Sequence, residues 1–216
     1  MLDLTFAKEG NSCCWIASVS FVVGMIIFNP SKLTPKSAIT MDIFALAQGR
    51  VDAKKRLTGH RQDGCNPIKT LTAIIENLYD DIVIKNIKPE GSSILIALNR
   101  HLNQGLYQNL PTFLVFSLDR VDDKGRQILT YVEEPEEVDI NSENRILFTV
   151  VSILYRSYHD SDHYACLIRD AGERYLYVEG ATQYIYKDYD EWQKCGLNKR
   201  DMYGYVYVYG IKNTKV

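Results

Sequence analysis

Residues 11–18 read NSCCWIAS, and in this stretch a polar turn runs into an apolar segment, residues 15–28, that has the character of a buried helix. Backbone N–H groups and the helix dipole at such a junction favour a thiolate over a thiol. Because the thiolate is the nucleophile of cysteine chemistry, the pair Cys13 and Cys14 predicts a nucleophilic site. The alternative is that both are small buried apolar residues.

A thiolate nucleophile needs a base, and His163 is the best placed of the histidines. His163 follows the polar stretch 157–162 and opens a predicted strand over residues 164–169. A loop-to-strand junction holds a side chain in place and leaves it accessible. The alternative is an ordinary surface histidine, and His159 is the weaker candidate for the base.

Glu179 is the expected orienting group for that imidazole, because a catalytic histidine relies on a third residue to hold one tautomer. Glu179 follows a predicted strand over residues 175–178. Two strands joined by a turn at residues 170–173 would bring His163 and Glu179 to the same end of a hairpin. The alternative for Glu179 is a turn carboxylate before Gly180.

The chain changes character at Leu110-Pro111. Before this point helical patterns dominate, at residues 15–28, 37–47 and 68–78. After it come short β-rich runs, at residues 113–118, 128–132, 146–155, 164–169, 175–178, 183–186 and 203–211. Residues 133–137, with four glutamates around Pro135, are expected to form a solvated loop. The pattern predicts a single α+β domain over residues 1–216, with a helical lobe at 1–109 and a β lobe at 110–216.

Composition narrows the function classes. Hydrophobic residues make up 46% of the 216, which excludes a disordered chain. The 25 Lys and Arg against 27 Asp and Glu give a net charge of −2, which disfavours nucleic acid as a partner. The longest apolar run, residues 21–28, is too short to span a membrane, and no leader segment is evident. Five cysteines are too few for a disulfide framework, which favours reduced thiols and an intracellular, cytoplasmic protein. Because no C-x-x-C pair occurs, we expect no metal and no cofactor.

Several segments, in order along the chain, resemble those of the ubiquitin-specific proteases. Residues 14–19 (CWIASV) are similar to the cysteine box of that family and to the Cys-Trp of papain-like enzymes. The other matching segments are residues 61–64 (RQDG), 110–121 (LPTFLVFSLDRV), 148–155, 163–168 (HYACLI, the histidine box), 175–179 (YLYVE) and 205–209 (YVYVY). Each segment alone is a weak signal, and their shared order across residues 10–209 carries the resemblance.

The resemblance implies a papain-like cysteine protease with a helical thumb and an antiparallel β palm. It implies cleavage of the (iso)peptide bond after the C-terminal Gly-Gly of ubiquitin, with ubiquitin or a ubiquitin-like protein and its conjugates as partners. Gln62 and Asp63 would line the channel for the basic ubiquitin tail, and Trp15, Tyr164 and Tyr177 would narrow it around the glycines. The segment 67–110 is short and contains no pairs of zinc ligands. Zinc-bearing fingers, which many members of the family have, are therefore expected to be absent or minimal. We expect the protein to be a monomer. Its compact size would suit either an enzyme of a large DNA virus, acting in the host cytoplasm, or a minimal eukaryotic enzyme.

The sequence also departs from the family pattern. Cys14 is favoured as the nucleophile because of the helix register that follows it, although Cys13 fits the spacing upstream. The family has an oxyanion-hole Asn five residues before the cysteine, where this chain has Glu9, and Asn11 is the available substitute. These departures leave two alternatives open. One is a protease for a SUMO-like or other ubiquitin-like modifier, or for a viral polyprotein; the other is a catalytically inactive ubiquitin-binding relative.

Overall fold

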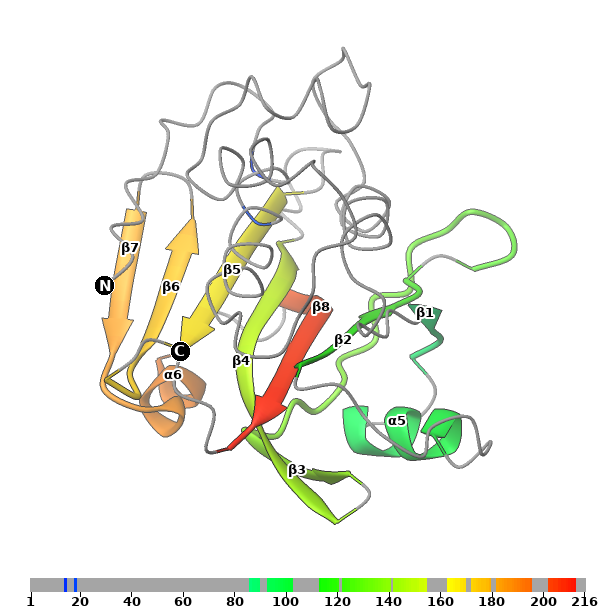
Figure 1. Ribbon diagram of the computed structural model, residues 1–216. Coiled ribbons are helices and arrows are strands. Elements are labelled where there is room, and N and C mark those ends of the chain that lie inside the picture. Colours follow the sequence, from blue (N-terminus) through cyan, green and yellow to red (C-terminus); the bar gives the residue numbers. More distant parts are fainter. Residues whose placement is uncertain are drawn as a thin grey trace, which may run out of the picture.

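The computed structural model describes residues 14, 18, 86–89, 93–102, 113–120, 122–140, 142–154, 163–169, 172–179, 182–195 and 202–212. Most of them form one sheet in the order β1-β2-β8-β4-β5-β6-β7, with β3 paired to β4 (Figure 1). The strands are β1 (Asn86–Ile87), β2 (Phe113–Leu118), β3 (Glu137–Ile140), β4 (Glu143–Leu154), β5 (His163–Arg169), β6 (Tyr175–Glu179), β7 (Thr182–Tyr186) and β8 (Met202–Ile211). The described helices are α5 (Ile94–Leu102) and α6 (Tyr189–Lys194). All strand pairs are antiparallel except β1 with β2.

β8, the last strand of the chain, lies in the middle of the sheet between β2 and β4. Its residues 205–209 alternate Tyr and Val, and each is at most 5% exposed. Aromatic and β-branched side chains pack well on a pleated surface, and burial on both faces requires apolar residues at every position. The most strongly predicted strand of the sequence therefore lies in the core of the sheet, with residues 205–209 buried on both faces.

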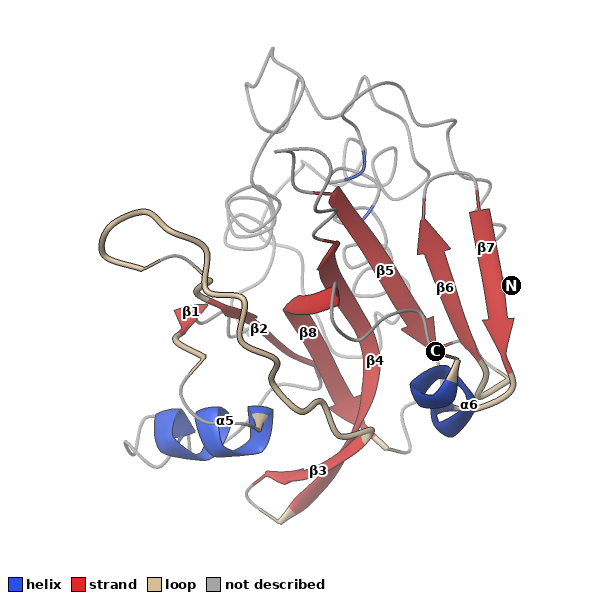
Figure 2. Ribbon diagram, turned by 180° about the vertical axis from the view of Figure 1, so that it is seen from behind, coloured by secondary structure: helices blue, strands red, loops and turns tan. Residues whose placement is uncertain are grey.

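The strand register assigns alternate side chains to two faces of the sheet. One face bears Phe116 of β2, which stacks on Tyr207 and Tyr209 of β8 with ring centroids 5.3 and 6.0 Å apart. The core on this face continues into Leu98 of α5 and Trp192 of α6. We call it the α6 face; Figure 2 shows α6 and the long loop after β2 in front of the sheet on this side. The opposite face, to which Cys166 belongs, is called the Cys166 face.

The strand predicted at residues 128–132 is not formed. The segment lies along the sheet as a loop, and buried Arg120 is bonded to its carbonyl groups. Arg120 Nη1 donates to the carbonyl oxygens of Ile128 at 3.2 Å and Thr130 at 2.7 Å, while Nε donates to Gly204 of β8 at 2.7 Å. The guanidinium thus takes acceptors that a neighbouring strand would otherwise use.

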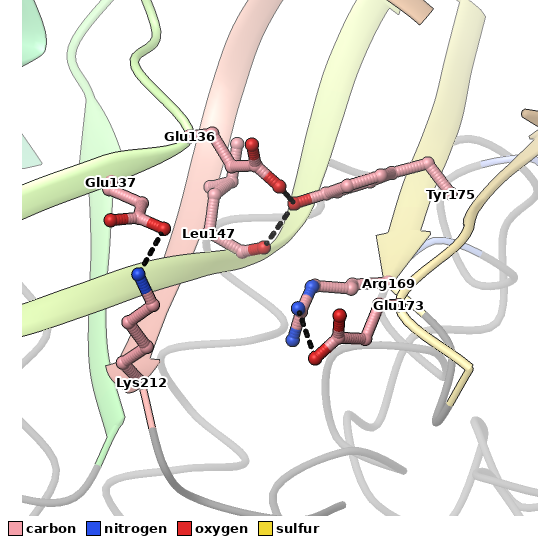
Figure 3. Close-up of polar contacts among 7 residues, drawn as sticks. All are labelled: Glu136, Glu137, Leu147, Arg169, Glu173, Tyr175 and Lys212. Atoms are coloured by element: carbon pink, nitrogen blue, oxygen red, sulfur yellow. Dashed lines mark hydrogen bonds and ion pairs between the residues drawn. The ribbon is translucent and has the colours of Figure 1, made fainter. Parts of the chain in front are cut away.

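The glutamate-rich segment is exposed or half-buried, as the sequence predicts, but three buried tyrosines anchor it to the sheet and α6. The Tyr189 hydroxyl donates to the Glu134 carbonyl oxygen at 2.6 Å, and the Tyr209 hydroxyl donates to that of Pro135 at 2.8 Å. The Tyr175 hydroxyl lies 2.9 Å from Glu136 Oε1 and 3.1 Å from the Leu147 carbonyl oxygen (Figure 3). The last residue, Glu137, already belongs to β3, where Lys212 Nζ binds its Oε1 at 2.6 Å.

Helices are few in the described part of the chain, which is mainly sheet. The helices predicted at residues 37–47 and 68–78 lie outside the described residues, and of residues 15–28 only Ser18 is described. β1 and α5 precede the expected lobe boundary at residue 110, yet β1 pairs with β2 and α5 packs on the core. Among the described residues, neither helix is long and apolar enough to cross a membrane.

Candidate functional site

His163 and Glu179 belong to neighbouring antiparallel strands. In the register of β5 and β6, Cys166 is opposite Val178 and Leu167 is opposite Tyr177. Continuing this register by one residue places Glu179 opposite Ala165, on the same face as His163 and diagonal to it. Diagonal neighbours on one face of a sheet lie within reach of long side chains. The hairpin therefore brings the two residues together, as the sequence spacing predicts.

The two side chains make contact. His163 Nε2 lies 3.4 Å from Glu179 Oε1, and the side chains are 29% and 21% exposed. β5 begins and β6 ends at the same end of the sheet, so that the pair lies at its rim (Figure 1). A carboxylate that faces Nε2 favours the neutral tautomer with its proton on Nε2, which leaves Nδ1 as the nitrogen that can accept a proton. This is the arrangement that general-base chemistry requires of a histidine.

Cys14 and Ser18 are the described residues of the N-terminal region, and both are helical and buried. Their separation of four positions is that of neighbours on one helix face. The Cys166 thiol of β5 donates to the Ser18 carbonyl oxygen, with 3.6 Å between the two heavy atoms. This contact ties Ser18, and with it the Cys14 region, to the middle of the strand that begins with His163.

The pleat of β5 restricts how a thiol and the imidazole can meet. Side chains alternate along a strand, so Cys166 and His163 leave β5 on opposite faces. A helix that packs on the Cys166 face can therefore reach His163 only around the end of the sheet. His163 is the first residue of β5, the one position of this strand where such an approach does not cross the sheet.

Cys14 and Cys166 are buried, whereas Cys195 is exposed. Cys166 is 1% exposed, and burial raises the pKa of its thiol to about 12, so it carries no thiolate at neutral pH. Cys195 is exposed at the C-cap of α6, and α6 lies at the opposite end of β6 from Glu179 (Figure 1). Among the described cysteines, Cys14 is the remaining candidate for a reaction partner of His163.

The remaining sequence-predicted residues divide into two groups. Asn11, Trp15, Gln62 and Asp63, together with Cys13, lie outside the described residues. Tyr164 is described: it is 9% exposed and packs against Tyr205 with ring centroids 6.1 Å apart. Its role in binding a substrate stays a prediction.

The expectation that Tyr177 lines a substrate channel with Tyr164 is wrong. Tyr177 is 1% exposed and belongs to the α6 face, whereas Tyr164 belongs to the Cys166 face. Sequence reasoning missed the contact that Tyr177 does make: its hydroxyl donates to Glu179 Oε2 at 3.3 Å. The signal for it was available, because residues two apart on a strand project from the same face.

A cavity of about 620 Å³ lies elsewhere, between the glutamate-rich segment and α6. It is lined by Tyr131, Glu133, Glu134, Pro135, Glu136, Tyr189, Asp190 and Gln193. None of the candidate residues of the sequence lines it. In the part of the chain that the structure describes, no three His, Cys, Asp or Glu side chains are grouped to hold a metal ion.

No protein family model matches the chain, and no curated protein sequence matches it. Solved structures match its fold. The SAGA DUB module Ubp8/Sgf11/Sus1/Sgf73 bound to monoubiquitin contains a chain with a TM-score of 0.64 and 10% identity, over 97% of this chain and 69% of that one. The same module bound to ubiquitin aldehyde gives a TM-score of 0.64 at 10% identity, over 97% and 69% of the two chains.

A structure of an essential yeast splicing factor is equally similar, with a TM-score of 0.66 and 12% identity over 96% of this chain and 69% of that one. At these identities the likeness concerns the fold, and a fold can carry different functions. The chain has a fold like that of a ubiquitin-specific protease.

Proposed function

We propose that this chain is a thiol-dependent deubiquitinating hydrolase, a papain-like cysteine protease that cleaves the (iso)peptide bond after the C-terminal Gly-Gly of ubiquitin. Cys14 is the nucleophile, His163 the base and Glu179 the group that orients the imidazole. The proposal is supported by the fold shared with the DUB module and by the order of the sequence segments.

One observation carries the proposal: the 3.4 Å contact between His163 Nε2 and Glu179 Oε1, at the end of the strand on which the Cys14 region is docked. A histidine and a carboxylate in contact are common on protein surfaces. Here both side chains are half-buried at the end of the sheet, and we assign Cys14, a buried residue, as the third partner. This combination fits nucleophilic catalysis by a thiol.

The reaction follows from these roles. His163 Nδ1 takes the Cys14 proton, and Cys14 Sγ bonds to the carbonyl carbon of the terminal glycine. The oxygen of this intermediate accepts from the Cys14 backbone N–H and the Asn11 amide. The bond to the substrate lysine nitrogen then breaks, and the His163 proton goes to the leaving amine. His163 Nδ1 then deprotonates a water molecule, which attacks the thioester carbonyl carbon. The C–S bond breaks, and the proton returns from His163 to the Cys14 sulfur.

Substrate recognition is assigned to residues of the N-terminal half and of β5. Gln62 and Asp63 line the channel for the ubiquitin tail, where Asp63 pairs with an arginine. Trp15 and Tyr164 form the walls around the two glycines, which have no side chains to accommodate.

A covalent ubiquitin probe tests the proposal. Ubiquitin with a C-terminal propargylamide should add to the folded wild-type protein, and peptide mapping should place the adduct on Cys14. Cys14→Ala should abolish the adduct and lower hydrolysis of a fluorogenic ubiquitin substrate about a thousandfold or more. Cys13→Ala is the matched control and should retain both. Absence of any adduct in folded protein, or an adduct on another cysteine, contradicts the assignment.

A second candidate is a ubiquitin-binding protein without catalysis. It is favoured by Glu9, which stands where the protease family has its oxyanion-hole Asn. This candidate predicts that wild type and Cys14→Ala bind ubiquitin equally and that neither turns over substrate. Probes built on SUMO-like modifiers in the same assay distinguish a protease for another modifier.

A further inference from the structure

Glu179 bridges two side chains with its two oxygens. Oε1 faces His163 Nε2 at 3.4 Å, and Oε2 accepts from the Tyr177 hydroxyl at 3.3 Å. Tyr177 and Glu179 are two residues apart on β6 and project from the same face. The carboxylate plane is therefore set from one side by the phenol and presented on the other side to the imidazole.

The phenol is itself held rigidly. The Tyr177 ring stacks on Trp192 of α6, with centroids 5.2 Å apart and planes 26° from parallel. Asp188 caps the N-terminus of α6: its Oδ1 accepts from the Glu191 N–H at 2.8 Å, which fixes the first turn of this short helix. The ring is 1% exposed, so it has no room to rotate away from Glu179.

The Tyr177 hydroxyl keeps its proton beyond the pH at which an ordinary tyrosine ionises. Burial, and secondly the charge of Glu179, raise the pKa of Tyr177 well above its usual value. A phenol that stays protonated next to a carboxylate acts as a hydrogen-bond donor and not as an acceptor.

We propose that Tyr177 is a positioning residue of the candidate site, which holds the Glu179 carboxylate in the orientation that fixes the His163 imidazole. The expected effect of Tyr177 on turnover rests on the proposed function, because turnover requires an enzyme. The expected effect on structure, a single fixed state of the His163 imidazole, holds whether or not the protein is an enzyme.

The test uses Tyr177→Phe, which removes the hydroxyl and keeps the ring that stacks on Trp192. Tyr175→Phe is the matched control: Tyr175 is on the same strand and the same face and is also buried, but its hydroxyl binds Glu136 and the Leu147 carbonyl group. Circular dichroism and thermal unfolding establish that both variants fold. The first readout is the set of imidazole ¹⁵N resonances of His163, which report its tautomer and ring mobility; the second is turnover of the fluorogenic ubiquitin substrate.

Tyr177→Phe should broaden or split the His163 resonances and lower kcat about 3- to 10-fold with little change in KM, which corresponds to one ordinary hydrogen bond. Tyr175→Phe should leave the His163 resonances unchanged and kcat within about twofold of wild type. Unchanged His163 resonances in Tyr177→Phe overturn the inference, whatever the turnover. A response of the resonances in a protein that neither turns over substrate nor adds the probe supports the inference and overturns the proposed function.

Discussion

Replacement of Arg120 by methionine tests how far one buried cation holds the sheet together. Arg120 is 2% exposed and donates to the carbonyl oxygens of Gly204, Ile128 and Thr130. Gly204 lies on β8 opposite Ser152 of β4, which in turn lies opposite Ala165 of β5. The contacts of Arg120 therefore reach the end of the sheet that carries His163.

Opposing terms set the size of the effect. Each carbonyl group left without its donor costs about 1 to 3 kcal/mol when it stays buried. Against this, methionine avoids the cost of burying the guanidinium, a cost that also lowers the pKa of Arg120. We expect a net loss of about 2 to 4 kcal/mol in the free energy of unfolding. For a domain of this size the melting temperature should fall by about 5 to 15 °C.

Urea unfolding followed by circular dichroism measures the loss. Arg126→Met is the matched control, because Arg126 is in the same loop but its side chain is 72% exposed and pairs with Asp122. The control should change stability by less than about 1 kcal/mol. If Arg120→Met is as stable as the control, the three carbonyl groups have found other donors. The claim that the hydrogen bonds of Arg120 stabilise the sheet is then refuted.

Two further predictions concern groups whose pKa is raised by burial. Iodoacetamide at pH 8 should label Cys195 in the folded protein and leave Cys166 unmodified, since the pKa of the Cys166 thiol is about 12; peptide mapping would expose rapid labelling of Cys166. Buried tyrosines with raised pKa should make the free energy of unfolding fall in alkali. Above about pH 10 the unfolded state loses phenol protons that the folded state keeps. Their contribution to stability is therefore complete below that pH and is lost as the pH rises toward the folded-state pKa values. Absorbance at 295 nm should therefore rise together with unfolding, and smooth ionisation of a protein that stays folded would contradict the burial of these side chains. The tyrosines are Tyr175, Tyr177, Tyr186, Tyr189, Tyr207 and Tyr209.

The predicted strands that the structure contains are those with a strong local pattern. β2 has the predicted bounds, and the strands predicted at 146–155, 164–169, 175–178, 183–186 and 203–211 differ from β4 to β8 by a few residues at their ends. Runs of Val, Ile, Phe and Tyr bounded by turn residues specify strands wherever they pack, so local sequence suffices. The same spacing argument brought His163 and Glu179 to one end of a hairpin.

The sequence by itself determined β2 and β4 to β8 to within a few residues, because pleat and turn chemistry act over a few neighbouring positions, but it did not predict β1 or β3. Only the tertiary structure decided that Arg120 would take the carbonyl groups of residues 128–130, and that buried tyrosines would anchor the glutamate-rich segment. It alone decided that Ser18 would meet Cys166, 148 positions away. A buried polar group accepts whatever partner the packing of distant segments supplies, and no local pattern contains that information.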